Sequence, residues 1–236
     1  MVEYELFKIW PDHLKEMRLP GRKIIDIRVP DLEDKKKDFS KLQPSDTLFF
    51  KDTNNEILKT KVMKNNSKGA YVKHYHSAEE LVINEGLENV WPNAKSFEEA
   101  VNKCLQFPGY KDRVKQNGIY AIGLEKLQIY VAGPYTAPTP EEKKENIMRA
   151  IKIGIELSKL GYVPFVPHAA TADWELLGLN EQECLAIQRD MIRKSDAFFF
   201  IAPSPGTNSE RKLALELGMD IFTSVKDVQF WNAANK

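Results

Sequence analysis

The chain has 236 residues, of which 42% are hydrophobic and 29% charged, so it can bury one large or two small cores. Its 34 basic and 34 acidic residues cancel, which excludes a general electrostatic attraction to nucleic acid or membranes. No apolar run approaches membrane-spanning length and the amino-terminal residues are acidic, so we expect a cytoplasmic protein. The only cysteines, Cys104 and Cys184, suggest neither a disulfide framework nor a zinc cluster.

Short strand-like runs with polar interruptions fill the first part of the chain. Strands are predicted at residues 23–28, 47–51, 56–63, 71–74 and 118–124, with helices at 78–84 and 96–105. This pattern predicts an α+β domain over residues 1–126, built as a small, mostly antiparallel barrel.

The first of these strands carries three charged residues. Because side chains alternate along a strand, Asp26 and Arg28 share one face and could pair, whereas Lys23 lies on the opposite face. Farther along, His74 and His76 also share a face, but with no third ligand in view the sequence predicts no metal site.

After residue 127 strands and helices alternate strictly. Strands are predicted at residues 127–132, 163–166 and 197–201, and helices at 141–160, 181–194 and 209–218. Such alternation predicts a parallel sheet with right-handed crossovers, and therefore an α/β domain over residues 127–236.

The turn after the apolar strand 197–201 is suited to binding an anion. Pro203, Pro205 and Gly206 end the strand, and Thr207 or Asn208 is expected to cap the following helix. The free amides of the first helical turn would then face a phosphate or a developing negative charge.

Glu210 is the candidate catalytic carboxylate. Leu213, Ala214 and Leu217 follow it at three, four and seven residues, so Glu210 should lie above the inward face of the helix, whereas Glu216 should face solvent. The position alone leaves two interpretations open, a ligand-facing carboxylate or a residue that complements the helix dipole.

Two other segments are expected near the ligand edge of the sheet. Gly133 permits close backbone approach and Tyr135 offers a hydroxyl, in a loop expected to face the turn at Gly206. Asp190 lies beside the apolar stripe of the helix 181–194. It either orients a substrate or the catalytic glutamate, or forms a helix-terminal salt bridge with a neighbouring arginine.

Residues 129 to about 225 resemble the nucleoside 2-deoxyribosyltransferase-like superfamily, which includes nucleotide N-glycosidases. The matching pieces are Ile129-Tyr-Val-Ala-Gly-Pro-Tyr135, residues 161–168, Arg189-Asp190, and Gly206-Thr-x-x-Glu210 with Gly218 at the family spacing. Pro203-Ser204-Pro205 stands where many members carry an aspartate, and Arg211-Lys212 replace the small residues common in the transferases. These departures leave the choice between ribose and deoxyribose open.

The resemblance implies a flavodoxin-like (Rossmann-like) fold in which Glu210 attacks the anomeric carbon of a nucleoside or nucleotide. A carboxylate under the sugar suits an oxocarbenium-like transition state. By family correspondence Asp190 would hold the sugar or the nucleophile, and Tyr135 would contact the ligand. Water would complete a hydrolase, which we favour, and a second base would complete a transferase. No cofactor is implied.

The resemblance also implies a substrate-binding set. Gly206, Thr207, Asn208 and Ser209 would cradle a 5′-phosphate if the substrate is a monophosphate, and otherwise only cap the helix. Further substrate-binding candidates are Gly133, Pro134, His168 and Trp174, of which the last two are placed to stack on a base. His168 is also a candidate proton donor. Superfamily members often complete their sites across a subunit interface, so a homo-oligomer is expected.

The first domain resembles the ASCH family, a barrel related to PUA domains. The resemblance rests on residues 21–28, 42–50 and 118–124, with Lys23, Asp26 and Arg28 in the signature that would bind a ligand. ASCH domains are associated with RNA or nucleotide binding, and some hydrolyse N4-acetylcytidine with a lysine, a threonine and a glutamate. Asp26 takes the threonine's place, which argues against that activity.

Two classes of function follow. The first is an enzyme that cleaves or exchanges an N-glycosidic bond, with the ASCH domain aiding nucleotide or RNA recognition. The second is an RNA- or nucleotide-binding or nucleotide-sensing protein without turnover.

Overall fold

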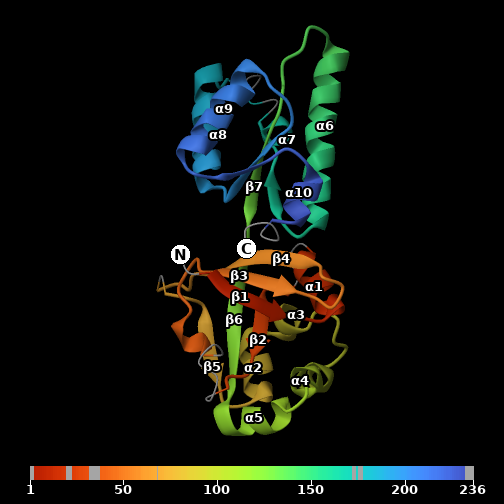
Figure 1. The fold of residues 1–236 in the computed structure, drawn as a ribbon, viewed down its shortest axis with the longest axis vertical. Helices are drawn as coiled ribbons and strands as arrows, with labels where there is room; N and C mark the ends of the chain where they lie inside the picture. Colours follow the sequence, from red (N-terminus) through yellow and green to blue (C-terminus); the bar gives the residue numbers. More distant parts are fainter. Residues whose placement is uncertain are drawn as a thin grey trace. The chain divides into compact units, whose positions relative to one another are not determined.

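The chain folds into two compact units, Met1–Lys126 and Leu127–Lys236 (Figure 1). The computed structural model describes residues 3–19, 23–31, 38–67, 69–171, 174 and 178–231. Within these ranges, every helix is too short or too polar to cross a bilayer.

The first unit contains a six-stranded sheet in the order β1-β3-β4-β6-β2, with β5 also paired to β6. Its strands are β1 (Glu3–Lys8), β2 (Ile25–Arg28), β3 (Thr47–Lys51), β4 (Ile57–Val62), β5 (Val72–Tyr75) and β6 (Ile119–Lys126). All pairs are antiparallel except β1 with β3. The long strand β6 pairs with β4 near its end and with β2 and β5 near its start, so the sheet curls around it. The predicted mostly antiparallel sheet is confirmed.

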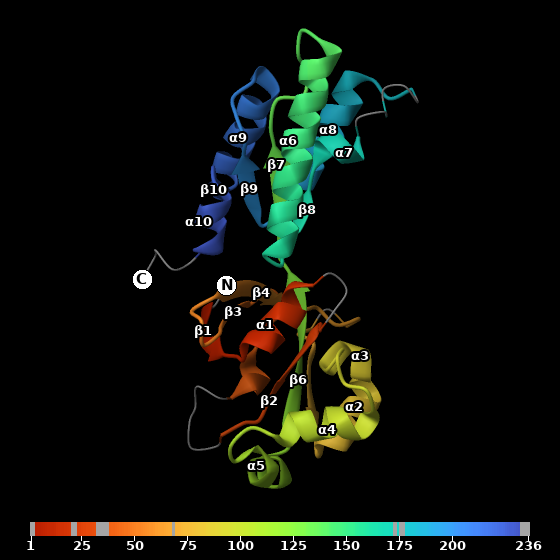
Figure 2. The ribbon, with the colours of Figure 1, turned by 90° about the vertical axis from the view of Figure 1, so that its right-hand side faces the viewer.

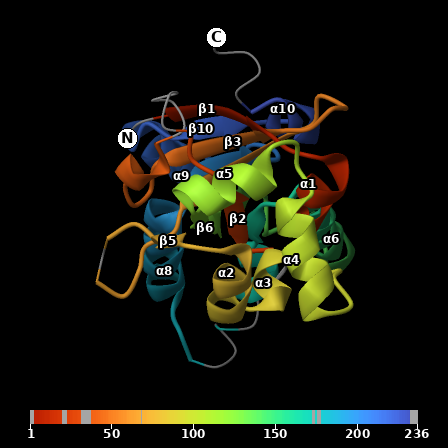
Figure 3. The same ribbon diagram turned by 90° about the horizontal axis from the view of Figure 1, so that it is seen from below.

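Short helices cover this sheet. They are α1 (Pro11–Arg18), α2 (Ala78–Glu85), α3 (Leu87–Val90), α4 (Phe97–Leu105) and α5 (Tyr110–Asn117), with a 3-10 turn at Phe39–Lys41. Ser77 and Ser96 cap α2 and α4 by accepting hydrogen bonds from backbone amides. Helices α2, α3 and α4 lie beside one another (Figure 3) and share an apolar core with β2. The sequence prediction lacked β1, α1, α3 and α5.

The second unit is built on four parallel strands in the order β10-β9-β7-β8 (Figure 2). The strands are β7 (Gln128–Ala132), β8 (Val163–Phe165), β9 (Ala197–Phe200) and β10 (Asp220–Phe222). The helices are α6 (Pro140–Lys159), α7 (Pro167–Ala170), α8 (Glu181–Lys194), α9 (Pro205–Glu216) and α10 (Val225–Gln229). The predicted α/β unit with a parallel sheet is confirmed, and it is extended by β10, α7 and α10.

Helices cover both faces of this sheet, with α6 and α10 on one side of β7 and α8 and α9 on the other (Figure 1). Ile129 and Val131 of β7 enter the core beside α6, whereas Tyr130 and Ala132 enter the core beside α8 and α9. Burial on both faces explains why β7 reads as a continuous apolar run.

The strand order fixes where a ligand can enter. In the order of the chain, the strands lie 2-1-3-4, so the connections leave the central pair β7 and β9 in opposite directions. In open α/β sheets of this type, ligands bind in the crevice outside the carboxyl ends of the strands at that switch point. The loops after Ala132 and Phe200 therefore flank the expected site.

Helix α9 begins earlier than predicted. It starts at Pro205, and its cap is Ser204, whose hydroxyl accepts a hydrogen bond from the Thr207 amide, so the expected caps at Thr207 or Asn208 are wrong. Proline favours the first helical position because its φ is already helical and the amide it lacks would be unpaired there. As a result, Glu210 lies in the second turn of the helix.

Candidate active site

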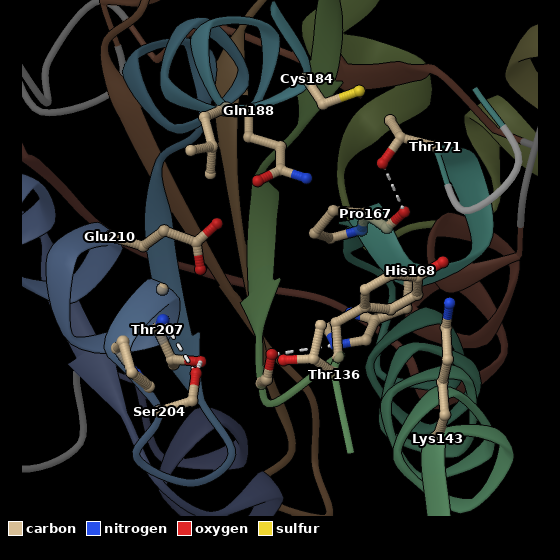
Figure 4. Close-up of a pocket in the computed structure, with 15 residues that line it drawn as sticks. Thr136, Lys143, Pro167, His168, Thr171, Cys184, Gln188, Ser204, Thr207 and Glu210 are labelled. Atoms are coloured by element: carbon tan, nitrogen blue, oxygen red, sulfur yellow. Dashed lines mark hydrogen bonds between the residues drawn. The ribbon is translucent and has the colours of Figure 1, made fainter. Parts of the chain in front are cut away.

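A pocket of about 330 Å³ opens at the switch point of the second unit (Figure 4). It is lined by the loop after β7 (Gly133, Tyr135, Thr136), by α6 (Lys143), by α7 and the residue after it (Pro167, His168, Thr171), by α8 (Cys184, Leu185, Gln188) and by the start of α9 (Ser204, Pro205, Gly206, Thr207, Glu210).

The carboxyl of Glu210 is held inside this pocket by a buried tyrosine. The Tyr130 hydroxyl donates a hydrogen bond of 2.6 Å to Glu210 Oε1. Burial raises the pKa of Glu210 from its ordinary 4.5 to about 7, and the hydrogen bond from Tyr130 opposes part of that rise. The Tyr130 ring is fully buried and packs against Phe165 and Phe198. Glu210 is therefore a positioned carboxyl that titrates near neutral pH.

The remainder of α9 explains why Glu210 and Glu216 differ. Ala214, one turn after Glu210, is fully buried in the core that contains Tyr130, whereas Glu216 is exposed as predicted. Leu217 is 47% exposed, so the inward stripe is shorter than its spacing predicted.

His168 fixes the loop after β7. Its Nε2 lies 3.0 Å from the carbonyl oxygens of both Gly133 and Pro134, so this nitrogen carries the proton that bonds the loop. Burial lowers the pKa of His168, and the two carbonyls raise it in part. The ring is therefore neutral at pH 7 with its proton facing the backbone, a geometry that does not suit the proton-donor role.

Gly133 is required for steric reasons. A Cβ at this position would lie 2.9 Å from the side chain of Ile201, which follows β9. The close approach expected for Gly133 is thus to the neighbouring strand.

Tyr135 and Lys143 form the outer wall of the pocket. The Lys143 ammonium lies 4.2 Å from the centre of the Tyr135 ring, whose edge faces His168 at 5.9 Å between ring centres. A cation on the face of an aromatic ring is held there by the ring quadrupole. This wall therefore gives the pocket a cationic side.

The start of α9 is not the open amide cradle that the sequence predicted. Pro205 has no amide hydrogen, and the amides of Thr207 and Asn208 donate to the side chain and the carbonyl of Ser204. The Ser204 and Thr207 hydroxyls lie 2.7 Å apart. Within the described part of the chain, the Gly206 amide is the one backbone donor in the first turn of α9 that has no acceptor.

Asn208 and Ser209 are exposed and absent from the described lining, so the structure does not bring them to the ligand space. Their contact with a phosphate therefore stays a prediction that the pocket lining does not support.

Asp190 lies outside the pocket as described. Its side chain is 67% exposed and forms an ion pair of 2.9 Å with Arg193, one turn later on α8. This is the salt bridge that the sequence left as the alternative to a catalytic role. Trp174 is half-buried, and its backbone bonds to Thr171 and Leu179, but it is not among the described lining residues.

The structure adds site residues that the sequence analysis missed: Tyr130, which lies behind the pocket and holds the Glu210 carboxyl, and the lining residues Lys143, Cys184 and Gln188. Tyr130 had a usable signal, because it is the one hydroxyl within the apolar run 129–132 and alternates away from Ile129 and Val131. Lys143 and Gln188 had none, since helix spacing does not say which polar residue overlooks a cavity.

In the first unit the three predicted ligand residues are largely internal. Asp26 accepts a 2.6 Å ion-paired hydrogen bond from Arg28 Nε, as expected from their shared face. Lys23 is 3% exposed, donates to the Val90 carbonyl at 2.8 Å and lies over the Trp91 ring. Burial lowers the pKa of Lys23, and the Asp26 carboxylate opposes that change.

His74 of β5 and His76, which follows that strand, are not arranged as a metal site. His74 Nε2 lies 2.8 Å from the Asn117 carbonyl oxygen, and the rings of His74 and His76 are 5.8 Å apart between centres. Among the residues that the structure describes, no group of three or more histidine, cysteine, aspartate or glutamate side chains is placed to hold a metal.

Fold and site together define a two-unit protein whose second, α/β unit carries a partly buried carboxyl in a pocket at the sheet's switch point. No family model matches the sequence, and a comparison with curated proteins finds no similar one. The crystal structure of hypothetical protein PH0355 is 28% identical, with a TM-score of 0.42, over 52% of this chain and 98% of that one. The solution structure of protein PF0455 from Pyrococcus furiosus is 27% identical, with a TM-score of 0.37, over 52% and 96%. The similarity covers the first part of the chain.

Proposed function

We propose that the protein cleaves the N-glycosidic bond of a nucleoside or nucleoside 5′-monophosphate, with Glu210 as the nucleophile and water as the preferred acceptor. One observation carries this proposal. The Glu210 carboxyl lines a pocket at the switch point, its pKa is raised to about 7 by burial, and its Oε1 is fixed by Tyr130. A carboxyl whose pKa is perturbed by burial inside a pocket is a candidate catalytic group.

The hydrogen bond assigns different tasks to the two carboxyl oxygens. Oε1 accepts the hydrogen bond from the Tyr130 hydroxyl, which leaves Oε2 to attack the anomeric carbon. As the C–O bond forms, the C–N bond breaks, and its electron pair leaves with the base, which takes a proton. Water then attacks the same carbon, the carboxylate departs, and a proton is released to solvent.

Burial makes this carboxylate both basic and reactive. A pKa of about 7 means that roughly half of the molecules carry the ionised form at neutral pH. The positive charge that develops on the sugar ring is stabilised by this poorly solvated negative charge, since attraction between opposite charges strengthens as water is excluded.

Among the described lining residues Glu210 is the one carboxyl, unlike the carboxyl pairs of most glycosidases. We therefore assign protonation of the departing base to water. Asp190 enters the proposal only through the family resemblance, because its ion pair with Arg193 supports a structural role instead.

The architecture supports the finer assignments. The strand order 2-1-3-4 of the second unit and its helices on both faces support a flavodoxin-like fold, whose order is 2-1-3-4-5. The curled sheet of the first unit supports a PUA-like, ASCH barrel. We propose that the first unit aids nucleotide or RNA recognition through the region of Lys23, Asp26 and Arg28. We further propose a cytoplasmic homo-oligomer.

The test is a panel of nucleosides and 5′-monophosphates, with free base measured by chromatography in the presence and absence of an acceptor base. Wild-type protein should release base, Glu210→Ala should release none while still binding, and Glu216→Ala on the exposed face should behave as wild type. Release without an acceptor identifies a hydrolase. No release by wild type from any member sinks the proposal and leaves binding without turnover.

A further inference from the structure

The pocket has two chemically different ends. At one end, Lys143 supplies a cation, and the start of α9 supplies hydroxyls and the Gly206 amide. The α8 side instead presents Leu185 and buried Cys184, with Pro167 opposite. Flat apolar walls with a single polar group are typical of sites that bind an aromatic ring, whereas charged and hydroxyl groups suit the sugar and its 5′ substituent.

The apolar end carries two polar side chains, Thr171 and Gln188, and the Thr171 hydroxyl already donates a hydrogen bond to the Pro167 carbonyl. Gln188, Cys184 and Leu185 lie three and four residues apart on α8 and therefore share one face. The primary amide of Gln188 points into the pocket, toward the space in front of the Glu210 carboxyl (Figure 4). The Gln188 side chain is half-buried, and its amide forms no hydrogen bond with the residues that the structure describes.

A primary amide presents a hydrogen-bond donor beside an acceptor. In a partly desolvated pocket both groups lose hydrogen bonds to water, and a ligand that pairs with them replaces those bonds. Adenine offers the complementary pattern on both of its edges, because its amino group lies between two ring-nitrogen acceptors. Guanine offers two acceptors on its N7 edge and a matching pair only on its N1 edge. A paired amide and adenine edge form two parallel hydrogen bonds.

We propose that Gln188 is the base-recognising residue of the site and that it selects adenine over guanine. This inference rests on the proposed function, because it takes the anomeric carbon to lie in front of Glu210 and hence the base to lie toward α8. The ring packs between Leu185 and Pro167, and its edge bonds to the Gln188 amide.

The test compares release of adenine and guanine from matched nucleosides and 5′-monophosphates, in both the ribose and deoxyribose series. Gln188→Leu removes the amide at similar size, and Gln188→Glu replaces a donor with an acceptor. The matched control is Gln182→Leu, a glutamine on the exposed side of the same helix. Circular dichroism and thermal melting verify that each variant is folded.

The adenine-to-guanine ratio of kcat/KM should fall roughly tenfold in Gln188→Leu. It should fall further in Gln188→Glu, because a carboxylate accepts from both N1–H and the amino group of guanine, whereas Gln182→Leu should keep the wild-type ratio. An unchanged ratio in both Gln188 variants, with turnover retained, overturns the inference while the proposed function stands.

If wild type releases no base, the proposed function fails, and the same variants are titrated by calorimetry with adenosine, guanosine and their monophosphates. Adenine-selective binding that is lost in both Gln188 variants supports the assignment. Absence of binding by wild type, or selectivity that is insensitive to Gln188, overturns it.

Discussion

Replacing Glu210 by glutamine should stabilise the second unit above about pH 4.5, and most strongly at neutral and alkaline pH. Glutamine retains the size of the side chain and the oxygen that accepts the Tyr130 hydrogen bond. Glutamine does not ionise, whereas the pKa of Glu210 rises from 4.5 to about 7 on folding. The folded protein therefore binds the Glu210 proton more tightly than the unfolded chain does. Ionising Glu210 therefore costs folding free energy above pH 4.5.

The size of this effect follows from linkage. Each pKa unit corresponds to about 1.4 kcal/mol, so the cost grows through the interval from pH 4.5 to about 7 and levels off near 3 kcal/mol above pH 8. Below pH 4 both proteins carry a neutral side chain at this position, and the difference between them should vanish.

The assay is urea unfolding followed by circular dichroism at a series of pH values between 4 and 9. The free energy of unfolding of Glu210→Gln minus that of wild type should increase with pH by about 3 kcal/mol. Glu216→Gln, on the exposed side of the same helix, should show no comparable trend. If the difference in the free energy of unfolding between Glu210→Gln and wild type does not depend on pH, folding does not raise the pKa of Glu210, and the reasoning is refuted.

Three further outcomes are expected. Tyr130→Phe removes the hydrogen bond that lowers the pKa of Glu210, so the acidic limb of the kcat/KM profile should move from about pH 7 upward by about one to two pH units. Gly206→Ala adds a Cβ with no protein atom within 4 Å, so the free energy of unfolding should rise by about 0.5 kcal/mol. The same Cβ fills space at the start of α9, so kcat/KM should fall. Unchanged kinetics would place the substrate elsewhere. Arg28→Ala leaves the buried Asp26 carboxylate without its ion-pair partner and should cost about 3 kcal/mol in urea unfolding, whereas a cost below 1 kcal/mol would show that other contacts satisfy Asp26.

Periodicity alone predicted the elements whose patterns are local and strong. The strict alternation after residue 127 gave the parallel sheet, and the spacing of Ala214 from Glu210 placed that carboxyl on the inner side of α9. Strand β1 was missed because it is stabilised by parallel pairing with the distant β3, which no local window contains.

The errors at the site have a different cause. Capping depends on which hydroxyl meets which amide, and Ser204 took the position assigned to Thr207 because proline favours the first helical turn. The sequence left two roles open for Asp190, a ligand-orienting one and a salt bridge, and only three-dimensional geometry showed its pair with Arg193. Gln188 and Lys143 became visible as pocket residues only once α6 and α8 were packed on the sheet.

The two faces of β7 belong to two different cores of the second unit, and only one of these cores lies behind the pocket. Ile129 and Val131 pack with α6 in a core that shares no residue with the described pocket lining, whereas Tyr130 packs in the core of the helices that carry Gln188 and Glu210. Substitutions on the pocket side of α8 can therefore change the pocket without loosening the opposite core, since sites without shared contacts contribute nearly additively to stability. A strand that reads as one apolar run in sequence thus separates the packing behind the pocket from the packing that holds α6 and α10.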